Sequence, residues 1–92
     1  MEDSEFQRIA KALADPSRFE LLQQVAASAE EIACTEINAS SNLTKATLSH
    51  HLKELADSGL IEVRRESRFM YLRLHRPTLD RYLRALRSRL SK

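Results

Sequence analysis

The chain is poor in residues that cross-link a polypeptide or interrupt its regular structure: its 92 residues include one cysteine, one glycine and two prolines. One cysteine excludes an internal disulfide and favours a cytoplasmic setting. So few glycines and prolines leave room for few tight turns, which favours a helical protein. No apolar run approaches the ~20 residues of a membrane span, and the acidic start MEDSEFQRIA is not typical of a signal peptide. We therefore expect one small cytoplasmic domain over residues 1–92, with no membrane partner.

Charge is distributed unevenly, although the formal net charge is only +2. Residues 1–46 hold four Lys/Arg and eight Asp/Glu, a net charge of −4, whereas residues 47–92 hold eleven and five, a net charge of +6. A basic half is expected of a nucleic-acid binder. An ordinary solvated surface is the alternative, and the asymmetry alone does not decide between them.

Apolar spacing and capping residues predict three helices before residue 44. The first helix, about residues 4–14, has apolar residues at i, i+3, i+4 and i+7: Phe6, Ile9, Ala10 and Leu13. Asp15 followed by Pro16 predicts the start of a second helix, with an N-cap and a proline at its first position. A short third helix is expected to begin at an N-cap near Thr35. Asn42 is then expected to take the left-handed conformation in a tight turn.

The stretch TKATLSHHLKEL predicts a helix over about residues 44–58, capped by Thr44 and ended at Gly59. Its apolar stripe consists of Leu48, Leu52 and Leu55. On a helical wheel His50 lies opposite the stripe, whereas His51 borders it and is expected to be a half-buried packing or hydrogen-bonding residue. The outward face therefore carries short hydroxyls and an imidazole in place of the usual long polar side chains.

After Gly59 the apolar period changes from 3.6 to 2. The segments LIEVRR and FMYLRL both alternate, and the polar ESR lies between them, which predicts a β-hairpin over about residues 60–74. Ser67 occupies a turn position where glycine would be easier. The tip of this hairpin is basic and contains Arg64, Arg65 and Arg68.

The last segment predicts a helix over about residues 77–90. Its leucines recur in four-three-four steps, which is typical of a coiled-coil seam: Leu79, Leu83, Leu86 and Leu90. We favour a partner helix as the neighbour of this seam. The alternative is that these leucines only cap the domain's own core.

A short helix, a tight turn and a helix with a polar outer face together predict a helix-turn-helix, and the basic hairpin adds a wing. Short side chains let such a helix approach the base edges in a major groove, and lysines and arginines reach phosphates. Only Glu54, on the rim of this face, is acidic. The candidate contacts with double-stranded DNA are Lys45, Thr47, Ser49, His50 and Lys53 on the helix and Arg64, Arg65 and Arg68 on the wing.

Two stretches, KALADPSRFELLQQV and TKATLSHHLKELADSGLIEVRRESRFMYLRL, resemble the ArsR/SmtB family of winged helix-turn-helix repressors. The resemblance implies a mostly α-helical fold with a β-hairpin wing (α+β). It also implies a homodimer, joined through the first and last helices, that represses transcription from a pseudo-palindromic operator. Many such repressors are released by a small inducer, which this sequence does not identify. The expected interface residues are Phe6, Ile9, Leu13, Leu79, Leu83, Leu86 and Leu90.

The familiar metal sites of that family are not matched. The resemblance places the cysteine pair of the arsenite-type site at Ala33 and Thr35, with Cys34 between them, and one thiolate cannot build a multi-sulfur site. The other family site uses Asp, His and Glu on the last helix, which here has Asp80 but no histidine, since His75 precedes it. We therefore expect no metal and no cofactor.

Two alternatives to a simple repressor remain open. Cys34 lies near a helix N-terminus, which lowers a thiol pKa, so a redox-responsive repressor is conceivable; the nearby glutamates act in the opposite direction, and a plain buried cysteine is the common case. A winged helix can also use the same face for a protein partner. An enzyme is a poor third choice, because no phosphate-binding loop, nucleophile motif or acid–base pair is present.

Overall fold

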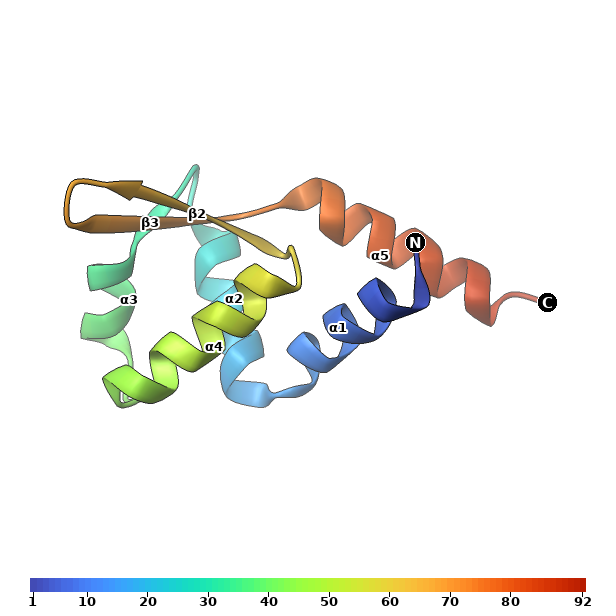
Figure 1. Ribbon diagram of the computed structural model, residues 1–92, viewed down its shortest axis with the longest axis horizontal. Helices are drawn as coiled ribbons and strands as arrows, with labels where there is room; N and C mark the ends of the chain where they lie inside the picture. The colour runs from blue at the N-terminus through green and yellow to red at the C-terminus, as the bar shows by residue number, and fades with distance from the viewer.

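The computed structural model describes residues 1–92 and contains five helices and three strands (Figure 1). In chain order the elements are α1 (Asp3–Ala14), α2 (Pro16–Ala27), β1 (Ile32–Ala33), α3 (Cys34–Ser40), α4 (Lys45–Asp57), β2 (Ile61–Glu66), β3 (Phe69–Leu74) and α5 (Arg76–Leu90). The expected mostly helical fold with a hairpin wing is confirmed. None of the helices has the length and apolar character needed to cross a membrane.

The sheet has one strand more than the sequence predicts. β1 pairs antiparallel with β3, which pairs antiparallel with β2, so the order is β1-β3-β2. Two residues are too few to show an alternating pattern, which explains why β1 was missed. Because directly opposite residues share a face, Val63 and Leu72 lie on the inner face with the helices, and Arg64 and Tyr71 lie on the outer face.

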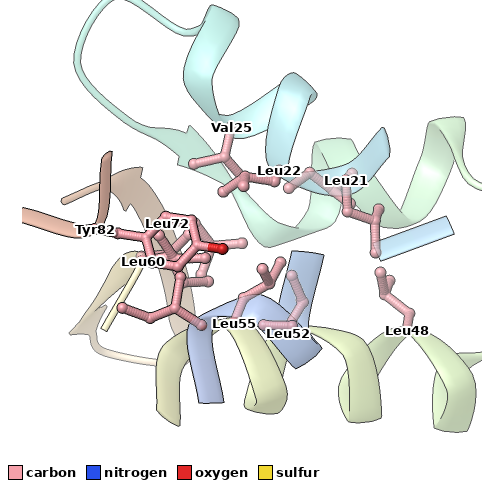
Figure 2. Close-up of a cluster of buried hydrophobic side chains, with 13 residues drawn as sticks. Leu21, Leu22, Val25, Leu48, Leu52, Leu55, Leu60, Leu72 and Tyr82 are labelled. Carbon is pink, nitrogen blue, oxygen red and sulfur yellow. The ribbon is translucent and has the colours of Figure 1, made fainter. Parts of the chain in front are cut away.

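The core lies between α2, α4 and the sheet. Figure 2 shows the apolar side chains of α2 and of α4 pointing toward one another. The predicted stripe of Leu48, Leu52 and Leu55 is buried, as expected. This burial fixes which side of α4 faces water and leaves the opposite side exposed.

Several local predictions about helix ends are confirmed. The Asp15 side chain accepts a hydrogen bond from the Arg18 backbone N–H at 3.0 Å, and Pro16 is the first residue of α2. Thr44 caps α4 by accepting from the Thr47 backbone N–H at 3.2 Å. Gly59 has a φ of +83°, the left-handed conformation that ends many helices.

Two local predictions are wrong. α3 begins at Cys34 after an N-cap at Ala33 that has no side-chain bond, so Thr35 lies inside the helix. The only non-glycine residue with positive φ is Ser67, at the hairpin tip, so Asn42 is not left-handed. The turn before α4 is instead made with extended backbone and with the Ser41 hydroxyl, which accepts from the Leu43 backbone N–H at 2.9 Å.

The first and last helices pack against each other and are joined at the surface by ion pairs. The rings of Phe6 and Tyr82 lie 5.1 Å apart between centroids. Arg81 contacts Glu5 at 2.9 Å, and Arg89 contacts Asp3 at 2.8 Å. The acidic first half and the basic last helix therefore partly neutralise each other within one chain.

The leucine seam of α5 is divided between the core and the surface. Leu79 and Leu86 pack against the core, whereas Leu83 is 51% exposed and Leu90 is 79% exposed. Tyr82 is also buried, a core position that the leucine spacing does not predict. Ile9 is fully buried within its own chain, so it has no surface for a partner, and its assignment to a dimer interface is wrong in this structure.

Candidate nucleic-acid interface

The outward face of α4 is an exposed row of small and basic side chains. Lys45, Ser49 and His50 are exposed, and their side chains make no hydrogen bond or ion pair within the chain. His51 is turned inward and is 7% exposed. The adjacent histidines thus face opposite environments, as the helical wheel predicts, and His50 remains available to another molecule.

Two further α4 side chains are exposed but already have intrahelical partners. The Thr47 hydroxyl lies 2.9 Å from the Thr44 hydroxyl, and one hydroxyl can still make additional bonds. Lys53 Nζ lies 2.8 Å from Asp57 Oδ2, an exposed pair in which the carboxylate raises the pKa of the lysine. Such pairs in water are weak, so Lys53 can exchange Asp57 for a phosphate.

The wing tip is a two-residue turn, Ser67 and Arg68, between β2 and β3. Ser67 has a φ of 58°, which agrees with the prediction that glycine would be easier at this position. Arg68 lies 5.7 Å from the centre of the exposed Phe69 ring. Arg65 lies opposite Met70, on the inner face of the sheet, and has no ion-pair partner.

Arg64 differs from the other two wing arginines because it lies on the outer face of the sheet. Its guanidinium donates to both carboxylate oxygens of Glu31, at 2.6 and 3.2 Å, and lies 4.5 Å from the centre of the Tyr71 ring. Glu66 contacts it as well, at 3.5 Å. Arg64 thereby ties β2 to the segment before β1. These partners make it a poor candidate for a DNA contact, contrary to the sequence-based assignment.

The residues considered for sensing do not form a recognisable metal or redox centre. Cys34 is half-buried against the core, and burial raises the pKa of its thiol, which makes the reactive thiolate scarcer. His75 Nδ1 lies 2.7 Å from the Thr78 hydroxyl, and no group of three or more His, Cys, Asp or Glu side chains is placed to hold a metal ion.

Both surfaces considered for DNA contact lie at one end of the molecule. The beginning of α4 and the tip of the hairpin lie at the end of the 47 Å long axis opposite the end of α5 (Figure 1). The candidate interface therefore combines an exposed helix face, whose groups can bond bases and phosphates, with a basic hairpin at the same end of the molecule. The exposed leucines of α5 belong to the helix at the opposite end of the molecule.

Comparison with known proteins identifies relatives of the chain. Residues 13–64 match a helix-turn-helix domain family. The chain is 37% identical over 76 residues to the HTH-type transcriptional regulator YceK of Bacillus subtilis, covering 83% of this chain and 76% of that protein. It is 32% identical over 80 residues to the arsenical resistance operon repressor of Staphylococcus xylosus, covering 87% and 75%.

The fold recurs in solved structures. An ArsR-like transcriptional regulator from Rhodococcus sp. RHA1 superposes with a TM-score of 0.82 at 21% identity, over 92% of this chain and 78% of that one. The fold, the sequence relatives and the exposed face of α4 therefore all indicate a winged helix-turn-helix regulator. The chain belongs to the ArsR family of winged helix-turn-helix transcriptional regulators, which bind DNA.

Proposed function

We propose that this protein is a transcriptional repressor that acts in the cytoplasm as a homodimer. Each subunit consists of a single winged-helix domain and binds one half of a pseudo-palindromic DNA operator. The observation that carries the proposal is the outward face of α4, which is exposed and carries short polar side chains over its first two turns. Repression is supported by the Staphylococcus xylosus relative described above, which is named as an operon repressor.

The side chains divide into two groups by what they can contact. Thr47, Ser49 and His50 are short enough for their polar atoms to reach base edges when α4 enters a major groove. Lys45 and Lys53 on the helix and Arg65 and Arg68 on the wing act on phosphates, which position the protein without reading the sequence. Arg64 is left out because Glu31 and Glu66 already hold it.

Exposed leucines support the proposed dimer. Leu83 and Leu90 are large apolar side chains in water on a terminal helix, and Leu79, Leu86, Phe6 and Leu13 lie partly exposed nearby. Pairing α5 with α5 of a second copy would bury these side chains and remove the cost of exposing them. It would also direct the two α4 helices away from the dimer axis, toward separate half-sites.

The test is a titration of labelled duplex with the purified protein at several salt concentrations. We use the best duplex that the protein selects from a random pool, and a scrambled duplex of the same composition. The proposal predicts half-sites spaced about 10 base pairs apart or a multiple of that, and log K falling linearly with log salt. Weak binding that ignores sequence would favour a protein-interaction module and contradict the proposal.

A further inference from the structure

A largely buried polar cluster lies at the corner where α1, α2 and α4 meet. It consists of two buried side chains, Arg18 and His51, which are 9% and 7% exposed, and of Asp15 at the start of α2, whose side chain is 40% exposed. Burying a charged guanidinium is costly unless its donors are satisfied. The hydrogen bonds that satisfy Arg18 therefore also connect the three helices.

Arg18 makes the connections. Its Nη1 donates to the Lys11 carbonyl oxygen at 3.2 Å, one of the last four carbonyls of α1, which lack partners inside that helix. Its Nε donates to His51 Nδ1 at 3.3 Å. One side chain of α2 is thus bonded both to the end of α1 and to the inward face of α4.

The tautomer of the neutral His51 ring follows from this geometry. Arginine can only donate hydrogen bonds, so the Nδ1 that faces Arg18 must carry a lone pair. In the neutral ring the proton is then on Nε2, which lies 3.9 Å from Asp15 Oδ1. A second proton on Nδ1 would face the Arg18 donor and place two cations side by side.

The polar and charged groups around His51 come from three elements. Arg18 of α2 opposes a positive ring, whereas Asp15 attracts one; α1 contributes the Lys11 carbonyl through Arg18, and on α4 itself the His50 ring lies 6.0 Å away. The Arg18 backbone N–H bond is the largest cause that lowers the pKa of Asp15, so Asp15 stays ionised where histidines titrate. A proton on Nδ1 would therefore oppose the Arg18–His51 bond and favour the His51–Asp15 pair.

We propose that His51 is a positioning residue for DNA reading: its neutral imidazole, bonded to Arg18, fixes the orientation of α4, and protonation of the ring releases that bond. His51 follows His50 directly in the helix, so a rotation of α4 at His51 displaces the base-reading face itself. The inference rests on the proposed base-reading role of α4.

Protonation of His51 is expected to lower the affinity for the specific duplex more than the affinity for duplexes of unrelated sequence. Contacts with base edges require accurate placement of α4, whereas phosphate contacts by long, flexible side chains tolerate a tilted helix. Acidification also makes the molecule as a whole more positive, which strengthens attraction to any DNA. A loss of specific affinity on acidification is therefore opposite in sign to the general electrostatic effect.

Three variants separate positioning from mere packing. In His51→Asn the amide oxygen can accept from Arg18 where Nδ1 does, but the side chain does not titrate. In His51→Leu the acceptor is lost, and Arg18 Nε is left buried without a partner. His75→Gln is the matched control, because it replaces a histidine that lies outside this cluster.

The experiment measures affinity for the selected duplex and for the scrambled duplex from about pH 8 to pH 6, the range in which histidine changes charge. Circular dichroism at each pH checks that the helices persist. For the wild type and His75→Gln, we expect the ratio of specific to scrambled affinity to fall roughly tenfold, the size of one lost bond to a charged group. For His51→Asn the ratio should stay nearly constant.

His51→Leu should show a low ratio of specific to scrambled affinity at every pH. If this variant does not fold, the comparison of the wild type with His51→Asn still tests the inference. Equal pH dependence of the ratio in wild type and His51→Asn would overturn the inference while leaving the proposed function in place. Failure of the wild-type protein to select any duplex would overturn both.

Discussion

The three wing arginines lie within five residues of one another but have different partners. Arg64 is held on the outer face of the sheet by Glu31, whereas Arg65 on the inner face has no acidic partner. An arginine that must first leave a carboxylate gains less from a phosphate than one that is already solvated. Position in the sequence alone does not separate them, because the pairing with Glu31 joins residues 33 apart.

For DNA binding, Arg65→Ala should therefore weaken affinity for all duplexes about equally and reduce the salt slope by about one, as expected for one lost phosphate contact. Arg64→Ala is the matched control on the neighbouring residue and should change the slope much less. Titrations at four or more salt concentrations measure both. A larger slope change for Arg64→Ala than for Arg65→Ala would show that the assignment is reversed.

Cys34 is a second position where the environment decides the chemistry. Burial raises the pKa of its thiol, so at neutral pH less thiolate is present than in a free cysteine. We expect the folded protein to react with an aromatic disulfide reagent more slowly than free cysteine does at about pH 7.5. The rate should rise as the pH increases, and it should approach the free-cysteine rate in denaturant. A faster reaction in the folded state would revive the redox-responsive alternative.

At the scale of elements, how well the sequence predicts the structure depends on length and on the strength of the periodic pattern. α4 and α5 are long amphipathic helices, and Thr44 and Gly59 mark the ends of α4, so both helices were predicted closely. β1 has two residues and exists only because β3 offers it a free edge. The turn before α4 depends on the Ser41 hydroxyl, a tertiary detail that residue preference for Asn42 does not contain.

The candidate site shows the same division. The outward direction of His50 and the inward direction of His51 follow from the burial of the α4 leucines, and a helical wheel predicts both. The partner of His51 could not be predicted, because Arg18 lies 33 residues earlier and reaches it only when α2 and α4 pack. Likewise, the position of Ile9 in the subunit core depends on how α1 packs, not on its spacing.

The exposed stripe of α5 leads to a prediction about assembly. Leu83 is about half exposed at the edge of this stripe, so Leu83→Arg adds charge to the proposed interface without filling the core. We expect light scattering to show monomers for this variant and dimers for the wild type. Ser88→Arg, an exposed position on another side of the same helix, is the control and should remain dimeric. A dimer that persists in Leu83→Arg would place the interface elsewhere.

At the scale of the whole molecule, charge serves two separate purposes. The acidic residues of α1 pair with arginines of α5 at one end, while α4 and the wing leave basic side chains available at the other. The total positive charge of residues 47–92 is thus not a measure of DNA affinity, because part of it is paired with α1. The basic side chains proposed to contact DNA lie at the α4 end, opposite the end of α5 (Figure 1).

In the proposed function, DNA reading and dimerisation take place at opposite ends of one small domain. Dimerisation at the α5 end would carry the two α4 helices outward, so each could enter a separate major groove. The whole account depends on the exposed face of α4 contacting bases, because the dimer and the wing only position that face.

The most direct test is to select duplexes from a random pool with the wild type, Thr47→Ala, His50→Ala and Arg65→Ala, and to compare the preferred base at each position. We predict that Thr47→Ala and His50→Ala each relax the preference at particular positions of both half-sites, by about 1–3 kcal/mol per lost base contact. Arg65→Ala should keep the same preferences at lower affinity. If base preferences survive unchanged in both α4 variants, the exposed face of α4 does not read DNA.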